Sequence, residues 1–117
     1  MPNSTKEKVE SFLNDFHTKL NVFSIVFENR PKNRQTLADL EISYNQRIDF
    51  IKSMKPEDYI DGPNKDTNDT TRPDYWVFGI KVKEKDIYVK INLGYSNKPV
   101  ICISFHIAEF SLEFPFK

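Results

Sequence analysis

Apolar residues recur at helical spacing near the start of the chain. Ser4 and Glu7 form a capping box there, which satisfies two amide donors of a first helical turn. The apolar stripe that follows consists of Val9, Phe12, Leu13, Phe16 and Leu20. This pattern predicts an amphipathic helix that begins at Ser4 and ends near Leu20.

After this helix, the sequence predicts an extended segment and then a polar loop. Val22–Phe27 is β-branched and aromatic, which predicts a strand. Glu28–Arg34 is a polar loop with a cationic bias, and its basic residues either contact phosphate or lie solvated in the loop. Thr36–Leu40 is ambiguous, and we expect a short extended segment there.

A second helix and a long loop occupy the middle of the chain. Ser43 and Gln46 form another capping box, and apolar residues at helical spacing continue to Met54. Pro56 ends this helix, because proline has no amide hydrogen to donate. Residues 61–74 are rich in Asp, Asn, Thr and Pro, which predicts a turn-rich loop.

Three alternating segments in the second half of the chain predict an antiparallel sheet. They span Tyr75–Lys83, Asp86–Leu93 and Pro99–His106, and short polar turns separate them. The tail Phe110–Lys117 also alternates. It either packs back onto the body or adds a further strand, which Pro115 confines to the edge of the sheet.

Strand parity assigns the side chains of this sheet to two faces. One face is wholly apolar and packs on the helices; it carries Trp76, Phe78, Ile80, Val82, Ile87, Val89, Ile91, Leu93, Ile101, Ile103 and Phe105. The opposite, solvent-facing side carries Tyr75, Val77, Gly79, Lys81, Tyr88, Lys90, Asn92, Cys102, Ser104 and His106. The second face is therefore the one that can hold a reactive site.

The two expected hairpins bring polar residues of this second face together. A turn centred on the Lys-Glu-Lys-Asp segment sets Lys81 across from Tyr88. In the next hairpin, Tyr88 lies beside either His106 or Ser104. Lys90 and Ser104 occupy the adjacent row.

This combination of residue types suits RNA cleavage. Attack of a ribose 2′-hydroxyl on the adjacent phosphate needs a general base, a general acid and positive charge. Histidine moves protons near neutral pH, lysine supplies charge, and tyrosine orients, donates a proton or stacks on a base. The alternative interpretation is an exposed sheet face that simply carries polar residues.

Charge is balanced overall but unevenly distributed. The chain has 17 basic and 17 acidic side chains, so its formal net charge is zero and it lacks the strongly basic balance of many nucleic-acid-binding proteins. Residues 75–107 hold five lysines against two acidic residues, a net charge of +3. Residues 55–74 hold three basic and six acidic residues, a net charge of −3. The predicted sheet is therefore weakly positive beside an acidic flank.

The length predicts one domain, 1–117, and the order of the predicted elements makes it α+β, with N-terminal helices packed on one face of a mostly antiparallel sheet. No run of apolar residues is long enough to span a membrane, and the N-terminal segment lacks the core of a signal peptide. Cys102 is the single cysteine and is expected to be structural. We therefore expect a cytoplasmic protein without a disulfide, a metal site or a cofactor.

The segment Gln35–Phe105 resembles the MqsR family of type II toxin–antitoxin toxins, which belongs with the RelE-like mRNA interferases. The matching pieces are IKSMKPEDY at Ile51–Tyr59, Trp76 opening a strand, IYVKI at Ile87–Ile91, and VICISFH at Val100–His106. These pieces occur in the same order in the family. The resemblance implies a RelE/MqsR-like fold.

The resemblance also implies a set of site residues. It matches the active-site tyrosine of the family to Tyr88, and it places His106 where the family has a lysine. This chain differs from the family at two further positions. Asp61 stands where the family has a lysine, and Val77 stands where the family has a glutamine. The candidate catalytic residues are Tyr88, His106, Lys90 and Lys81, and the candidate RNA-binding residues are Arg72, Lys83, Ser104 and Arg34.

The function that the resemblance implies is a metal-independent endoribonuclease toxin. It would cleave mRNA, alone or on the ribosome, and so inhibit translation. Its implied partner is a cognate antitoxin with a helix-turn-helix DNA-binding part. One alternative is a catalytically inactive module that binds RNA or protein through the basic sheet face, and another is an interaction module unrelated to RNA.

Overall fold

The structure is a computed structural model that describes residues 3–117, so Met1 and Pro2 of the expected domain lie outside the described residues. Its elements are α1 (Lys6–Phe23), β1 (Ile25–Phe27), α2 (Pro31–Leu40), α3 (Tyr44–Lys52), a 3₁₀ turn (Pro56–Asp58), β2 (Tyr59–Asn64), β3 (Tyr75–Val82), β4 (Lys85–Asn92) and β5 (Val100–Ile107). The predicted α+β class is confirmed.

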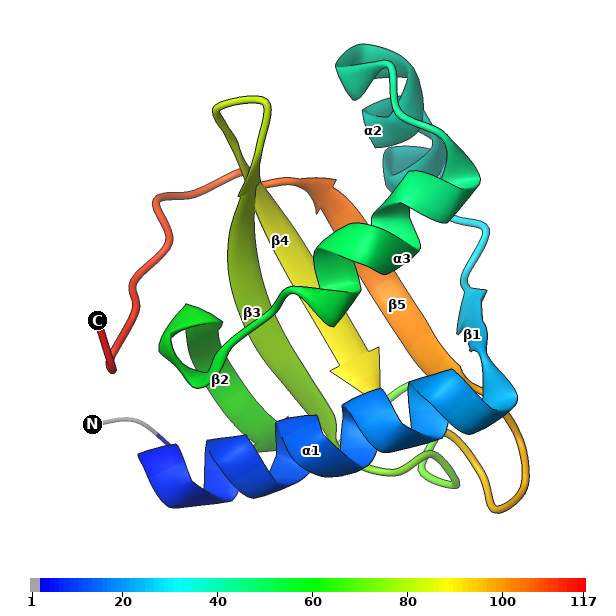
Figure 1. Cartoon of the computed structure of the whole chain (residues 1–117), viewed down its shortest axis with the longest axis vertical. Helices are drawn as coiled ribbons and strands as arrows, with labels where there is room; N and C mark the ends of the chain where they lie inside the picture. The colour runs from blue at the N-terminus through cyan, green and yellow to red at the C-terminus, as the bar shows by residue number, and fades with distance from the viewer. Residues whose placement is uncertain (1–2) are drawn as a thin grey trace.

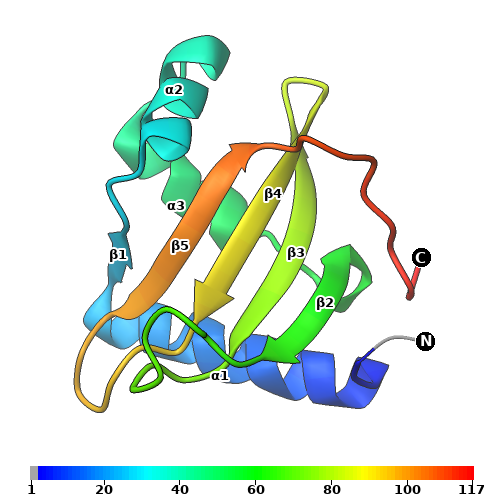
Figure 2. The ribbon, with the colours of Figure 1, turned by 180° about the vertical axis from the view of Figure 1, so that it is seen from behind.

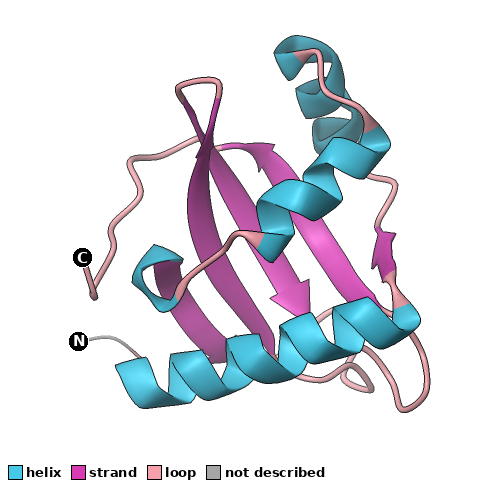
Figure 3. Ribbon diagram, in the orientation of Figure 1, coloured by secondary structure: helices cyan, strands magenta, loops and turns pink. Residues whose placement is uncertain are grey.

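The five strands form one sheet in the order β1-β5-β4-β3-β2. Neighbouring strands run antiparallel except β1, which pairs parallel to β5. Helices α1 and α3 lie across one face of the sheet, and α2 stands at the edge beside β5 (Figure 1, Figure 3). The opposite sheet face is turned toward the viewer in Figure 2 and is called the back face below.

The predicted apolar face of β3 and β4 packs against α1. Phe12 of α1 stacks on Trp76 of β3 with ring centroids 4.4 Å apart, and it also packs on Phe78. Every predicted stripe residue of α1, from Val9 to Leu20, is buried. Burial of large apolar side chains, worth about 1.5–3 kcal/mol each, is the main stabilising contribution of this layer.

Helix α1 differs from its prediction at both ends. Thr5 rather than Ser4 is the N-cap, and its hydroxyl accepts a hydrogen bond from the Lys8 amide. The helix also continues to Phe23, so β1 is shorter than the predicted strand Val22–Phe27. The β-propensity of this segment is a weak preference, which continuation of α1 overrides.

Helix α2 lies where the sequence predicted the end of the loop Glu28–Arg34 and the extended segment Thr36–Leu40. Pro31 occupies its first position, where proline fits because that amide has no partner within a helix. Asn33 and Thr36 are poor helix formers, yet both are buried. Tertiary contacts therefore decide this segment. In contrast, α3 begins with the predicted capping box of Ser43 and Gln46.

Two side chains of α2 replace a neighbouring strand along the C-terminal half of β5. The amide nitrogen of Asn33 donates to the carbonyl oxygen of Ile103, and its oxygen accepts from the amide of Phe105, both at 3.0 Å. The hydroxyl of Thr36 accepts from the amide of Ile107 at 3.1 Å. Since β1 has only three residues, these bonds satisfy the part of the β5 edge that β1 leaves free.

The hairpin between β3 and β4 is tighter than predicted. Its turn is residues 83–84, both with positive φ, a conformation that usually requires Asn or Gly. The sequence Lys-Glu carries no sign of such a turn. As a result, Tyr88 lies opposite Gly79, and Lys81 lies opposite Asp86 instead of Tyr88.

A bulge in the pairing of β4 with β5 sends Cys102 to the other face of the sheet. Lys90 pairs with Ser104, but the next residue, Ile91, pairs with Cys102. Cys102 therefore lies fully buried in the core beneath the helices, and Ile101 is on the back face. Strict alternation predicted the reverse, because a bulge adds one residue to a strand without changing its composition.

Strand β2 lies partly within the segment that was predicted as a loop. It pairs with β3 through Tyr59 opposite Phe78 and Asp61 opposite Val77, with a register shift between the two pairs. Short, irregular strands of this kind have no regular alternation to detect. The element nevertheless matters for function, because it adds Asp61 to the back face.

The C-terminal tail packs on the sheet without forming a strand, which selects the first of its two predicted alternatives. Leu112 and Phe114 lie against Gly79 of β3, so close that a Cβ atom there would be 2.7 Å and 3.0 Å from them. Phe116 stacks on Tyr59 with ring centroids 5.3 Å apart. The tail thereby covers the side of the sheet near β2 and β3.

Candidate active site

The back face is partly covered and is not the open surface that the sequence predicted; its part around Tyr88, Lys90, Ser104 and His106 is called the recess below. The loop formed by residues 65–74 crosses one end of it, and the tail covers the side at β3 (Figure 2). Ser104 is only 5% exposed, and Tyr88, Lys90 and His106 are half-buried. Charges in such a partly shielded recess interact more strongly than they do in open water.

Tyr88 of β4 and His106 of β5 form the centre of the recess. They are register partners, and their rings stack with centroids 5.3 Å apart and planes 18° from parallel. Of the two predicted neighbours of Tyr88, His106 is therefore the one that faces it. Lys90 and Ser104 pair in the next row, as predicted.

The backbone orients the His106 ring. Its Nδ1 lies 3.0 Å from the carbonyl oxygen of Ile107. A carbonyl oxygen can only accept, so Nδ1 carries a hydrogen and donates it. In the neutral ring, Nε2 then has the free lone pair and is the nitrogen that can accept a proton.

Tyr88 is a hydrogen donor at neutral pH. Burial raises the pKa of Tyr88 above its ordinary value, and the nearby Tyr75 and Asp61 raise it further. The phenol therefore keeps its hydrogen throughout the physiological pH range. A neutral phenol stacked on an imidazole provides one proton donor and one proton acceptor at the same place.

Lys90 brings positive charge into the recess. Its Nζ lies over the ring of Tyr75, 4.0 Å from the centroid. Burial lowers the pKa of Lys90, and the neighbouring charge of Arg30 lowers it further. Lys90 follows Tyr88 on the same face, about 7 Å further along the strand. Tyr75 was assigned to this face from sequence, but its contact with Lys90 depends on side-chain packing.

Asp61 and Val77 occupy the two positions at which the resemblance expects a lysine and a glutamine. The two residues are register partners, and Val77 is also the partner of Lys90. The Asp61 carboxylate accepts hydrogen bonds from the side-chain amides of Asn3 at 2.7 Å and Asn64 at 3.0 Å. The substituted positions therefore lie on the same face as the Tyr88–His106 pair.

A cavity of about 400 Å³ opens beside this pair, between β5 and the first turn of α2. Its lining consists of Arg30, Pro31, Lys32, Asn33, Ser104 and His106. Arg30 and Lys32 also form surface ion pairs, with Glu28 and Glu109 respectively. Phosphate contact was one of two interpretations of the basic 28–34 segment, and the fold brings two of its cations to the edge of the recess.

Arg72, a candidate RNA-binding residue, holds the loop of residues 65–74 in place. Its guanidinium lies 2.5 Å from the carboxylate of Glu28, 3.6 Å from that of Asp66 and 3.5 Å from that of Asp69. Asp66 also accepts hydrogen bonds from two backbone amides of the loop. Arg72 is thus surrounded by carboxylates, an arrangement that leaves little positive charge for a phosphate.

Three other candidates lie outside the centre of the recess. Lys81 is exposed at the hairpin, where its Nζ pairs with Asp86 at 3.3 Å. Lys83 donates to the carbonyl oxygen of Leu40 at the end of α2. Arg34 donates to the loop that precedes α2. Of the five lysines in 75–107, Lys90 is the one whose ammonium reaches the recess beside Tyr88.

No family model, curated protein or solved structure matches the chain. Within residues 3–117, no three His, Cys, Asp or Glu side chains are grouped closely enough to hold a metal ion. No helix in the same range is long and apolar enough to cross a membrane.

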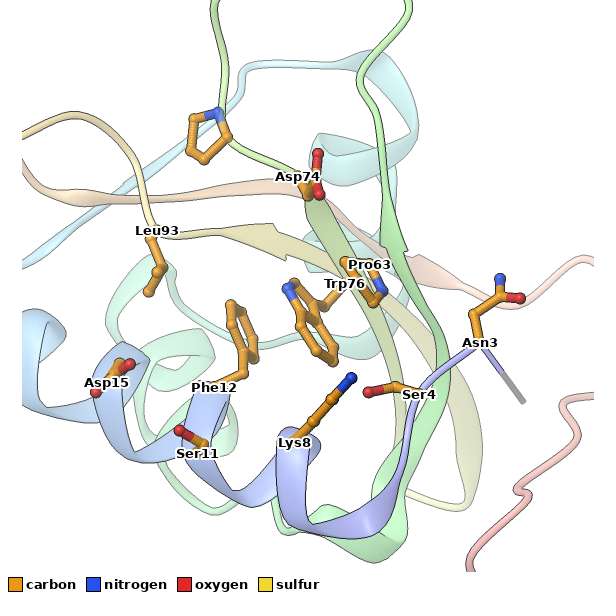
Figure 4. Close-up of a pocket in the computed structure, with 11 residues that line it drawn as sticks. Asn3, Ser4, Lys8, Ser11, Phe12, Asp15, Pro63, Asp74, Trp76 and Leu93 are labelled. Carbon is orange, nitrogen blue, oxygen red and sulfur yellow. The ribbon is translucent and has the colours of Figure 1, made fainter.

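A second cavity, of about 460 Å³, lies between α1 and the start of β3 (Figure 4). The stacked rings of Phe12 and Trp76 form its apolar wall, and Lys8, Asp15 and Asp74 supply its charges. Two carboxylates against one ammonium make it unsuitable for a phosphate backbone. The cavity includes none of the candidate site residues.

Proposed function

We propose that this protein is a metal-independent endoribonuclease that cleaves mRNA and acts as the toxin of a toxin–antitoxin pair. The observation that carries the proposal is the stacked pair of Tyr88 and His106, set on two paired strands with Lys90 in the adjacent row. A proton donor, a proton acceptor and a positive charge are the groups that cleavage of RNA through its 2′-hydroxyl needs.

In this mechanism, Nε2 of His106 takes the proton of a ribose 2′-hydroxyl, and the 2′-oxygen attacks the adjacent phosphorus. The bond from phosphorus to the 5′-oxygen breaks, and that oxygen takes the proton of the Tyr88 hydroxyl. The products are a 2′,3′-cyclic phosphate and a 5′-hydroxyl. Tyr88 then regains a proton from water, and His106 releases its own. Lys90 stabilises the negative charge that develops at phosphorus.

The resemblance to the MqsR family supports the same function. Its active-site tyrosine corresponds to Tyr88, and the histidine at position 106 stands in for a lysine at the corresponding place. The proposal includes a cognate antitoxin, with a helix-turn-helix part, that masks the recess. It also places the protein in the cytoplasm, where its mRNA substrate is translated.

The test is cleavage of a defined RNA by the purified protein in the presence of a chelator. We expect a 2′,3′-cyclic phosphate product, and no cleavage at a nucleotide whose 2′-hydroxyl is replaced by hydrogen. Induced expression should arrest growth, and co-expression of a small protein encoded beside the toxin should relieve it.

Variants locate the activity within the recess. Tyr88→Phe and His106→Gln should each lower the cleavage rate by about 10²–10⁴-fold, the usual contribution of a general acid or base. Tyr44→Phe and His17→Gln make the same chemical changes away from the recess and should leave the rate unchanged. RNA binding without cleavage by the wild type would support the inactive-module alternative instead. Equal rates in all four variants would overturn the site assignment.

A further inference from the structure

The cavity beside His106 has the features of an anion site. Its volume of about 400 Å³ is sufficient for a nucleotide-sized group. It is lined on one side by the first turn of α2 and on the other by β5 (Figure 2 shows α2 beside β5). The hydrogen bonds of Asn33 to β5 hold these two walls together.

The α2 wall presents the positive end of a helix that no side chain caps. Thr5 and Ser43 cap α1 and α3, whereas Arg30, at the N-cap of α2, makes no side-chain capping bond. The Asn33 side chain cannot cap its own helix because its hydrogen bonds go to β5 and to the Glu28 carbonyl. First-turn amides and the helix dipole therefore favour an anion in front of α2.

Ser104 on the β5 wall adds an unpaired hydroxyl to the lining of the cavity. Only 5% of the surface of this residue is exposed, and the residue lines the cavity. Within the described residues no hydrogen bond to a side chain pairs this hydroxyl, and its oxygen is not among the buried unpartnered atoms, so it opens onto the cavity and can meet a ligand there. A hydroxyl in this position can donate to a bound oxyanion.

The charges around the cavity are available to such an anion. Arg30 and Lys32 pair with Glu28 and Glu109, but the basic side chains of these pairs are 45% and 66% exposed. Exposed ion pairs of this kind contribute little to stability, so either cation can turn toward a phosphate at little cost. His106 lies on the opposite wall.

We propose that this cavity binds a phosphate group, held by the first-turn amides of α2, Arg30, Lys32 and the Ser104 hydroxyl. The inference rests on the proposed function for its biological ligand, which is the scissile phosphate of RNA. A phosphate in the cavity lies against His106, the residue proposed to activate the neighbouring 2′-hydroxyl. Helix α2 is then part of the active site, although it contributes no catalytic side chain.

The experiment uses inorganic phosphate as the probe, titrated into the full-length protein at constant ionic strength with chloride as the reference anion. We expect saturable amide NMR shifts at Lys32, Asn33 and Ser104, together with shifts of the His106 ring signals, and a dissociation constant of millimolar order. Chloride should not produce the same pattern.

Three variants test the assignment. Ser104→Ala should weaken phosphate binding about threefold and Arg30→Ala about tenfold, a factor that corresponds to about 1.4 kcal/mol. Lys85→Ala removes the same charge at an exposed site at the start of β4 and should leave binding within about twofold of the wild type. The dispersion of the amide spectrum shows whether each variant is folded. Uniform loss of binding in all three would overturn the proposal.

Failure of this inference can be distinguished from failure of the proposed function. Phosphate binding at these residues, with RNA left intact, would retain the anion site and overturn the endoribonuclease. RNA cleavage by a protein that shows no localised phosphate shifts would retain the endoribonuclease and overturn the cavity as its phosphate site.

Discussion

Tyr88 and His106 face each other across β4 and β5 with ring centroids 5.3 Å apart. The bulge in this strand pair begins only after Lys90 and Ser104. The pairing that brings the two rings together is therefore regular, and the irregularity affects only the residues beyond it. This places the stacked pair on rigid, hydrogen-bonded strands, which is the support that a proton-transferring pair requires.

Lys90→Met should separate activity from stability. We expect RNA cleavage to fall about tenfold or more, because a charge that stabilises the transition state is lost. The free energy of unfolding at pH 7 should stay the same or rise, because burial lowers the pKa of Lys90 and the folded state therefore disfavours the ammonium. Urea unfolding and RNA cleavage are the measurements.

The pH dependence gives this prediction a definite sign. The penalty on folding is fully present below the lowered folded pKa of Lys90. It disappears as the pH rises from that value to about 10.4, the pKa of an unfolded lysine. The wild type should therefore gain stability relative to Lys90→Met over this interval. The control is Lys85→Met, at an exposed site. The difference in stability between the wild type and this variant should not change over the same pH interval, and a change of equal size would contradict the explanation.

Cys102 should be unreactive in the folded protein. Burial raises the pKa of its thiol to about 12, so almost no thiolate is present at pH 8. Alkylation by iodoacetamide should be very slow in buffer and fast in denaturant, as followed by mass spectrometry. The folded state should lose stability as the pH rises above about 8.5, the unfolded pKa, toward the folded value. Rapid alkylation under native conditions would show that β5 opens locally.

Asn33→Ala should destabilise the protein although it removes no apolar contact. The substitution leaves the amide of Phe105 and the carbonyl oxygen of Ile103 without their partner in a buried place. We expect the free energy of unfolding to fall by about 2–6 kcal/mol, since each of the two orphaned groups costs about 1–3 kcal/mol. Gln35→Ala on the exposed side of α2 is the control and should cost less than about 0.5 kcal/mol.

Gly79→Ala should loosen the C-terminal tail. The added Cβ would lie 2.7 Å from Leu112, 2.9 Å from Ile60 and 3.0 Å from Phe114, all at the ends of side chains. The tail can therefore move aside, and we expect a loss of about 1–2 kcal/mol together with faster chymotrypsin cleavage at the exposed Phe110. Adding Leu112→Ala relieves the closest contact. If the double variant is as stable as Leu112→Ala with an intact glycine, the substitution acts only through this contact, whereas a further loss would assign part of the cost to Ile60 and Phe114.

Alternation of side chains was sufficient to predict the most important contact of the recess. Tyr88, Lys90, Ser104 and His106 were assigned to one face, and parity limited Tyr88 to two possible neighbours. The helix stripe from Val9 to Leu20 was equally readable. These predictions succeeded because each depends on a period repeated over several residues.

Other parts of the site depend on interactions that have no local pattern. Helix α2 forms because Asn33 and Thr36 bind the edge of β5, a contact between segments about 70 residues apart in the chain. Lys81 was wrongly predicted to lie opposite Tyr88, because the hairpin has a two-residue turn that lacks the usual glycine. The bulge that buries Cys102 likewise leaves no trace in composition.

Helix α2 has a second effect, on self-association. A sheet can recruit another chain wherever a strand edge shows a row of free amides and carbonyls. Here β1 offers only three residues, and the side chains of α2 occupy the β5 edge beyond it. On the other side of the sheet, β2 is interrupted by register shifts. Both borders of the sheet are therefore poor templates for pairing with another chain, and the helix proposed to bind phosphate also closes one of them.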